Sequence, residues 1–172
     1  SIRKLPNLIK EKGLKKVLIV TDKGLTSLGL LNSLYEEMDN AGVEYVVYDG
    51  TQPNPTIENI EEAKDMYNAN GCQGIIAFGG GSPMDCCKAA CAIAKGDDKI
   101  ESYHTGGKPI NKDEVIPMLA VATTSGTGSE ITNISVLTDL SKNVKSTMND
   151  PLMYPKAAIV DPRLTLSVPP KV

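Results

Sequence analysis

Residues 74–85 read GIIAFGGGSPMD, and this stretch decides how the rest of the chain is interpreted. Five residues suited to a buried strand run directly into three glycines, which a serine, a proline and an acid follow. A short apolar run ended by glycine is typical of a buried strand that leads into a loop. Three glycines also occur in flexible linkers, but the helix-start residues behind them favour an ordered loop.

Ser82, Pro83 and Asp85 have the spacing of a helix start, with serine as N-cap, proline at the first position and an acid at the third. Such a start points unpaired N–H groups and the positive end of the helix dipole outward. Glycine has no Cβ, so an anion can approach its backbone closely. The stretch predicts a phosphate-binding loop, with a purely structural tight turn as the alternative. It matches neither G-x-G-x-x-G nor G-x-x-x-x-G-K-[ST].

On either side of this stretch, apolar runs and longer polar or amphipathic segments alternate. We expect strands at 16–20, 43–49, 74–78, 117–123 and 157–161, helices at 27–41, 57–70 and 83–95, and a hairpin from 134–139 and 143–148. Alternation of this kind implies parallel pairing with right-handed crossovers. The predicted fold class is α/β, a doubly wound, mostly parallel, Rossmann-like sheet with helices on both faces. The 172 residues suit a single domain.

Ligands of such sheets bind at the carboxyl ends of the strands. Four predicted loops lie there, and all are rich in Gly, Thr, Ser, Asn or Asp: TDKG (21–24), DGTQPNP (49–55), GGGS (79–82) and TTSGTGSE (123–130). Five hydroxyl residues and two glycines fill the first seven positions of the last loop. A Ser/Gly linker has a similar composition, but the position directly after an apolar strand favours a second ligand loop.

Composition excludes several classes of protein. With 41% apolar and 23% charged residues, the chain is typical of a globular domain. A net charge of −3 without a basic stripe argues against nucleic acid and anionic membranes as partners, and the start lacks the apolar core of a signal peptide. The cysteines lack C-x-x-C spacing and lie far from the single histidine, His104, which argues against a zinc site. We expect His104 to lie at the surface. We expect the cysteines to be buried thiols in a cytoplasmic protein. They are Cys72, Cys86, Cys87 and Cys91.

With both glycine-containing loops in place, the chain resembles the iron-containing alcohol dehydrogenases, the group III metal-dependent family. The segments GGGSPMD (79–85), TTSGTGSE (123–130) and AIVDPRLTLSVPP (158–170) are similar to that family's signatures in their order and spacing. VTDKGL (20–25) and PNPT (53–56) are similar to further segments of it. The resemblance covers essentially the whole chain, and its motifs are specific as a set.

The resemblance implies a two-domain enzyme, with an N-terminal NAD(P)-binding domain and a helical domain that holds a divalent metal, iron or zinc, through one Asp and three His. The implied reaction is reversible hydride transfer between an alcohol and the cofactor, which yields an aldehyde or ketone, in a full-length homo-oligomer such as a dimer. This chain has one histidine and ends at Val172. We therefore expect residues 1–172 to be the dinucleotide-binding domain, without catalytic or metal-binding residues, inactive alone, and without the family's first strand.

Residue by residue, Asp22 matches the acid that binds the adenosine ribose, and its carboxylate favours NAD over NADP because it repels a 2′-phosphate. Gly80–Ser82 match the pyrophosphate loop, and Thr123–Thr127 match the loop around adenine and phosphate. The cofactor-binding residues implied are Asp22, Asn54, Gly80, Gly81, Ser82, Asp85, Thr123, Thr124, Ser125, Gly126, Thr127, Ile134, Lys145 and Leu164. Other interpretations stay open: Asp22 as a turn cap, Asp85 as a first-turn helix acid, and Lys145 as a solvated charge.

Two functions from different classes remain open on sequence grounds. One is the NAD-binding part of an alcohol dehydrogenase, and the other is a stand-alone dinucleotide-binding module without catalysis. Glycerol dehydrogenases and dehydroquinate synthases share the architecture, but TTSGTGSE fits the alcohol dehydrogenase branch better. The alcohol itself is not predicted, because the implied substrate pocket lies largely outside this chain.

Overall fold

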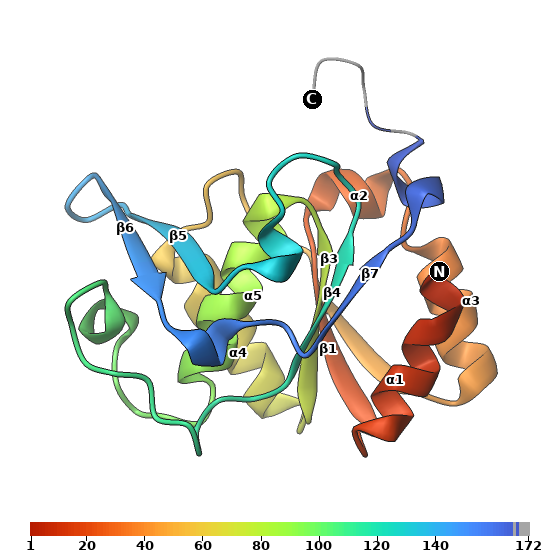
Figure 1. Ribbon diagram of the computed structural model, residues 1–172, viewed down its shortest axis with the longest axis horizontal. Helices are drawn as coiled ribbons and strands as arrows, with labels where there is room; N and C mark the ends of the chain where they lie inside the picture. Colours follow the sequence, from red (N-terminus) through yellow and green to blue (C-terminus); the bar gives the residue numbers. More distant parts are fainter. Residues whose placement is uncertain (167, 169–172) are drawn as a thin grey trace.

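A computed structural model describes residues 1–166 and 168, and its centre is a five-stranded parallel sheet (Figure 1). The strand order is β2-β1-β3-β4-β7. In that order the strands are Glu44–Tyr48, Lys16–Val20, Gly74–Gly79, Met118–Ala122 and Ala157–Val160. The chain moves outward from β1 to β2 and then crosses back to β3, so the order reverses between β1 and β3. In α/β sheets such a switch point opens a crevice for ligands.

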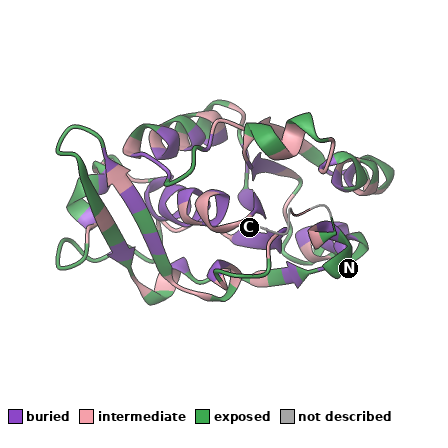
Figure 2. Ribbon diagram, turned by 90° about the horizontal axis from the view of Figure 1, so that it is seen from above, coloured by how far each residue is buried: buried purple, intermediate pink, exposed green. Residues whose placement is uncertain are grey.

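Helices cover both faces of the sheet, as the sequence predicts (Figures 1 and 2). Val17 and Ile19 of β1 pack with α1 (Leu5–Glu11) and α3 (Asn32–Ala41) on one face. Leu18 and Val20 pack with α4 (Ile57–Ala69) and α5 (Gly81–Ile93) on the other. All four side chains are fully buried. β1 requires a continuous apolar run because helices cover both of its faces and leave it no solvent face.

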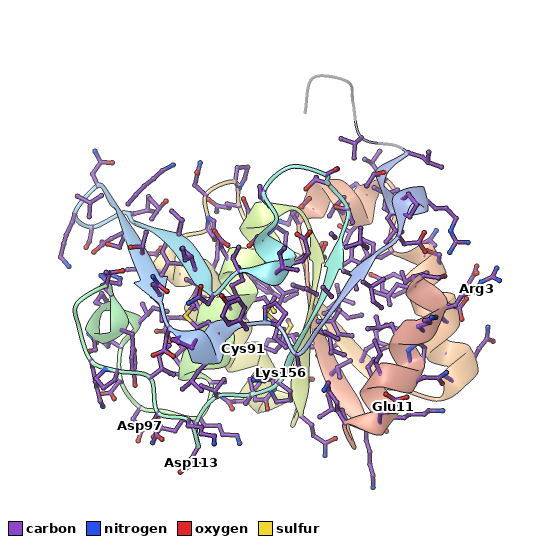
Figure 3. The ribbon with its side chains drawn as sticks, in the orientation of Figure 1. Arg3, Glu11, Cys91, Asp97, Asp113 and Lys156 are labelled. Carbon is purple, nitrogen blue, oxygen red and sulfur yellow. The ribbon has the colours of Figure 1, made fainter. Side chains whose placement is uncertain are left out.

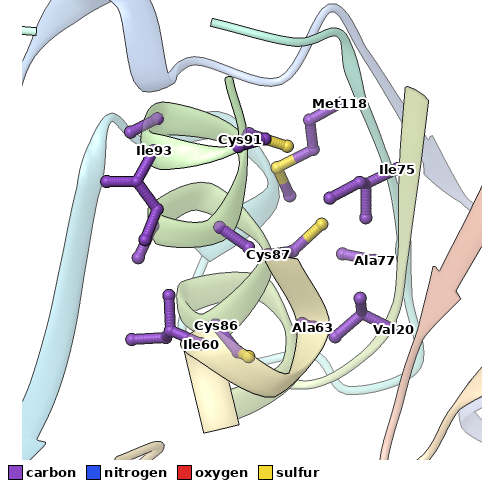
Figure 4. Packing of buried hydrophobic residues seen from close by; sticks show 14 of the residues in the cluster. Val20, Ile60, Ala63, Ile75, Ala77, Cys86, Cys87, Cys91, Ile93 and Met118 are labelled. Atoms are coloured by element: carbon purple, nitrogen blue, oxygen red, sulfur yellow. The ribbon is translucent and has the colours of Figure 1, made fainter. Parts of the chain in front are cut away.

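β5 (Ile134–Asp139) and β6 (Val144–Asn149) form the hairpin that the sequence predicts. The central helix, α5, lies between this hairpin and the sheet (Figure 1). Figure 4 shows Cys86, Cys87 and Cys91 of α5 among apolar side chains of the sheet and α4. All four cysteines are buried and free, as expected. Burial raises the pKa of Cys86 to about 12, so this thiol stays protonated at neutral pH.

Three features differ from the expected elements. The helix expected at 27–41 begins only at Asn32, as α3, and a separate short helix, α2 (Lys23–Ser27), precedes it; Gly29 between the two adopts φ +67°. α5 begins at Gly81 with Gly80 as N-cap, so Ser82 lies inside the first turn and is not the cap. The N-terminal segment forms η1 (Ile2–Lys4) and α1, which the sequence analysis did not predict.

Charged side chains such as Arg3, Glu11, Asp97 and Asp113 lie on the outside of the fold (Figure 3). Short 3-10 helices complete it. These helices are η2 (Ile100–Tyr103), η3 (Ser129–Ile131), η4 (Pro151–Met153) and η5 (Pro162–Thr165). Residues 167, 169 and 170 of the segment 158–170 lie outside the described residues. Among the residues that are described, no helix combines the length and apolar character that crossing a membrane requires.

Candidate functional site

A cleft of about 810 Å³ opens at the carboxyl ends of β1 to β4, a volume within the usual range of small-molecule sites. It lies at the edge of the sheet where α2 and the loop after β4 are found (Figure 1). All four loops predicted for this edge contribute to its wall. The lining residues are Asp22, Lys23, Gly24, Leu25, Leu28, Asp49, Gly50, Thr51, Gln52, Pro53, Gly80, Gly81, Ser82, Pro83, Thr123 and Thr124.

The three consecutive glycines have different roles. Gly79 adopts φ +151°, and a Cβ added there would lie 2.7 Å from Pro83 Cγ, so this position requires glycine for structural reasons. Gly80 has φ −87° and Gly81 is helical, so neither is glycine because of an unusual φ. Both line the cleft, where their missing side chains leave the backbone accessible.

The loop after β4 packs directly against these glycines. A Cβ on Gly80 would lie 3.1 Å from Thr124 Oγ1, and one on Gly81 would lie 3.1 Å from Thr127 Cγ2. At the start of this loop, the N–H of Thr123 donates to the Gly79 carbonyl over 3.0 Å. The two loops predicted to bind the cofactor are therefore neighbours. Ser125 and Gly126 continue the second loop as exposed residues outside the cleft lining.

The N-terminus of α5 opens into the cleft. Its N-cap, Gly80, brings no side chain that could accept hydrogen bonds from the first turn. Pro83 has no backbone N–H, so this one residue of the first turn adds no unpaired donor. The thirteen-residue helix therefore presents backbone N–H groups and the positive end of its dipole to the cleft. This arrangement fits a phosphate group.

Two carboxylates flank the opposite side of the cleft, after β1 and β2. Asp22 is the N-cap of α2, and its Oδ1 accepts a hydrogen bond from the N–H of Leu25 over 3.0 Å. The capping interpretation of Asp22 therefore describes the geometry, and the residue also lines the cleft. Asp49 Oδ2 accepts a hydrogen bond from Thr26 Oγ1 over 3.0 Å. The sequence analysis did not single out Asp49, although an acid directly after a strand at this edge is a known ribose-binding arrangement.

Asn54 lies beside the cleft and joins three elements. Its backbone adopts φ +57°, and its N–H donates to Ser82 Oγ over 3.3 Å. Its side-chain Oδ1 accepts from Lys145 Nζ over 2.9 Å, and its carbonyl accepts from Thr138 Oγ1 over 3.3 Å. Asn54 and Lys145 are not lining residues of the cleft, but the structure brings these two predicted residues together at its rim.

Asp85 faces the hairpin rather than the cleft. Its Oδ1 accepts from Ser129 Oγ over 2.9 Å, and its Oδ2 accepts from the N–H of Val136 over 3.1 Å. Burial raises the pKa of this carboxyl, against the lowering effect of these donors and of Lys88. Asp85 is the fifth residue of α5, not the third as expected, because the helix starts earlier. Its carboxylate holds η3 and β5 against α5.

The last two predicted residues lie apart from the cleft. Ile134 begins β5 and is 41% exposed. Leu164 is buried with the apolar residues on the α1 and α3 side of the sheet, and it lines a separate hollow with Ile2 and Arg3. In residues 1–166 and 168, no group of three or more His, Cys, Asp or Glu side chains is arranged to hold a metal ion.

Comparisons with known proteins show which family the chain is similar to. The model of the iron-containing alcohol dehydrogenase family matches residues 1–162. Lactaldehyde reductase from Escherichia coli K12 is 38% identical over 167 residues, which make up 96% of this chain and 44% of that protein. Choline dehydrogenase from Bacillus subtilis 168 is 35% identical over 162 residues, or 93% of this chain and 40% of that protein.

Solved structures show the same fold. The crystal structure of sulfoacetaldehyde reductase from Bifidobacterium kashiwanohense in complex with NAD+ matches with a TM-score of 0.93 and 36% identity, over 99% of this chain and 45% of that one. NADH-dependent butanol dehydrogenase A from Thermotoga maritima matches with a TM-score of 0.91 and 29% identity, over 98% of this chain and 42% of that one. The chain thus spans less than half the length of these relatives.

Proposed function

Since this chain belongs to the iron-containing alcohol dehydrogenase family, we propose that it supplies the NAD-binding half of an NAD-dependent, metal-dependent alcohol dehydrogenase. The reaction of the whole enzyme interconverts a small alcohol and an aldehyde or ketone by hydride transfer. The free thiols agree with a reducing, cytoplasmic location. By family resemblance we propose a homo-oligomer, a dimer or larger.

The observation that carries this proposal is the open backbone of Gly80, Gly81 and Ser82 at the start of α5, inside the cleft. A pyrophosphate placed there would receive backbone N–H donors and the favourable end of the helix dipole. The adenosine ribose would then lie toward Asp22, where its hydroxyls can donate to the carboxylate. Thr123 and Thr124 would border the phosphates from the loop after β4.

The role of this chain in the reaction is to bind and orient the cofactor. NAD, when bound, supplies the hydride chemistry, and the protein directs its nicotinamide toward the substrate. Lys145 and Asn54 stand at the rim, where they can contact the cofactor beyond its pyrophosphate. The described residues do not fit the divalent metal that the family's name implies, so the proposed chemistry of this chain is limited to the cofactor.

Calorimetric titration of NAD+ and NADP+ into the full-length protein tests the proposal. We expect NAD+ to bind at least about tenfold more tightly than NADP+, a difference of about 1.4 kcal/mol. An activity screen over ethanol, butanol, 1,2-propanediol and 1,3-propanediol then distinguishes a dehydrogenase from a non-catalytic module. For the 172-residue chain alone we expect no alcohol oxidation, even with added Fe²⁺ or Zn²⁺. Absence of binding by either dinucleotide would contradict the proposal.

A further inference from the structure

Lys88 is a fully buried lysine in α5, with 0% of its surface exposed. Lysine is almost never fully buried unless it is paired. Its Nζ donates hydrogen bonds to Ser129 Oγ over 2.7 Å, to Thr132 Oγ1 over 2.8 Å and to the Ile134 carbonyl over 2.9 Å. An ammonium group has three N–H donors, so all of them are satisfied.

A carboxylate one helical turn away completes the arrangement. Asp85 Oδ1 lies 3.8 Å from Lys88 Nζ and also accepts the hydrogen bond from Ser129 Oγ. Asp85 further binds β5, through the N–H of Val136 to Oδ2 and through Ser135 Oγ to its own carbonyl. Both charged residues therefore project from α5 onto one segment, residues 129–136.

That segment connects parts of the cleft that are distant in sequence. Ser129 lies near the end of the loop 123–130, whose first residues, Thr123 and Thr124, line the cleft. Ile134 begins the hairpin that carries Lys145 to Asn54. α5 itself starts at Gly81, within the proposed phosphate-binding residues Gly80–Ser82. Lys88 thus hydrogen-bonds the segment that connects the loop after β4 to the hairpin. Lys88 itself belongs to α5, the helix that directly follows the glycine loop after β3.

We propose that Lys88 is a positioning residue, whose ammonium group fixes the loop after β4 and the hairpin relative to α5 and so keeps the two nucleotide-binding loops in place. Its link to the cofactor rests on the proposed function. Packing alone would be served by an apolar side chain such as methionine, because burying an ammonium group costs free energy that a methionine avoids. Unlike methionine, Lys88 makes three directed hydrogen bonds, and these restrict residues 129–134 to one position relative to α5.

The test compares Lys88→Met with Lys95→Met in the full-length protein. Lys95 is exposed just beyond the end of α5, so the same substitution there removes a solvated charge only. Hydrogen exchange followed by mass spectrometry, without ligand, measures local opening. We expect peptides from 123–139 to exchange at least about tenfold faster in Lys88→Met, while peptides from β1 and β3 keep wild-type protection. Lys95→Met should match the wild type throughout.

Titration of NAD+ into the same variants tests the link to the site. We expect Lys88→Met to lower NAD+ affinity by about tenfold or more, because free energy must be spent on ordering the loop. Equal loosening of all peptides would overturn the proposal, since it would indicate a general stability role. Unchanged exchange at 123–139, or selective loosening with unchanged NAD+ affinity, would also overturn it.

Two further variants keep the proposal testable if Lys88→Met does not fold. Ser129→Ala and Thr132→Val each remove one acceptor of Lys88, and each should loosen the same peptides by a smaller factor of about threefold. No loosening in either would overturn the role of these bonds. If the wild-type protein does not bind NAD+ but Lys88→Met selectively loosens 123–139, the proposed function fails while the structural role of Lys88 stands.

Discussion

Lys145 Nζ donates a hydrogen bond to Asn54 Oδ1 over 2.9 Å, which joins the hairpin to the loop after β2. Asn54 has φ +57°, in the left-handed region that asparagine tolerates better than most residues. Its N–H also bonds Ser82 Oγ at the start of α5. One asparagine thus connects three separate parts of the cleft rim, through its backbone conformation and through its amide.

Replacing Asn54 separates these two contributions. Asn54→Gly keeps the left-handed backbone accessible and removes the amide, so we expect NAD+ affinity to fall by about tenfold with a melting shift of no more than a few degrees. Asn54→Ala adds a backbone penalty of about 1–2 kcal/mol and should melt lower. Asn143, with φ +52° in the hairpin turn, is the matched control. Asn143→Gly should leave affinity unchanged, and wild-type affinity in Asn54→Gly would contradict a cofactor role.

Selectivity between NAD and NADP is predicted to depend on the charge of Asp22. Asp22→Asn keeps an oxygen that can cap α2 at the N–H of Leu25, but it removes the repulsion of a 2′-phosphate. We expect this variant, like Asp22→Gly, to lose a preference for NAD of at least about tenfold, or ~1.4 kcal/mol. The ratio of kcat/KM for the two cofactors in the full-length enzyme measures it. A wild-type enzyme that already uses both equally would show that Asp22 has another role.

How far the sequence predicts this molecule depends on how local each cause is. The run 16–20 forms β1 within the expected bounds, because four consecutive apolar residues, Val17–Val20, determine it locally. The late start of α3, at Asn32 after Gly29, was not predicted, because an isolated glycine within a helical pattern is only a weak signal of a break. Burial of Lys88 was not predictable, since its partners Ser129 and Thr132 lie 41 and 44 residues away. The meeting of Asn54 with Lys145 is similarly non-local, and only the family resemblance indicated both residues.

Acid sensitivity should be measurable at the hairpin turn. Asp139 Oδ1 accepts hydrogen bonds from Ser141 Oγ over 2.6 Å and from the N–H groups of Ser141 and Lys142. These bonds and the Lys142 charge lower the pKa of Asp139 to about 2, with the Ser141 hydroxyl as the largest cause. Because the folded pKa lies below the unfolded value of about 3.9, the stabilisation is complete above that value and is lost as the pH falls toward 2.

The free energy of unfolding of the wild type minus that of Asp139→Asn should therefore be constant from pH 7 to about pH 5 and decrease between about pH 4 and pH 2. Urea titrations of both proteins across this range measure it, and other carboxyls cancel in the difference. Ser141→Ala removes the largest cause of the shift, so the Asp139→Asn difference in that background should depend less on pH. A difference that stays constant down to pH 2 would show that the turn does not lower this pKa.

Gly79 and Gly81 are predicted to respond differently to the same substitution. Gly79→Ala places a Cβ 2.7 Å from Pro83 Cγ at φ +151°, so it should lower stability strongly. The nearest contact of a Cβ at Gly81 would be Thr127 Cγ2 at 3.1 Å, and Thr127 is exposed. We expect Gly81→Ala to weaken NAD+ binding at least about tenfold and to lower the melting temperature by only about 2–4 °C. Calorimetric titration beside a thermal melt of the full-length variant measures both.

A second variant identifies the cause of that loss. Thr127→Ser removes the Cγ2 methyl and keeps the Oγ1 that accepts the N–H of Ser129 over 3.3 Å, so it relieves the contact with an alanine at position 81. If the methyl of Gly81→Ala occupies space that the pyrophosphate needs, the double variant should bind NAD+ as weakly as Gly81→Ala alone. Recovery of affinity in the double variant would instead show that the alanine acts by displacing the loop after β4. Unchanged affinity with a large drop in melting temperature would make Gly81 a structural glycine, and the phosphate would then have to bind elsewhere in the cleft.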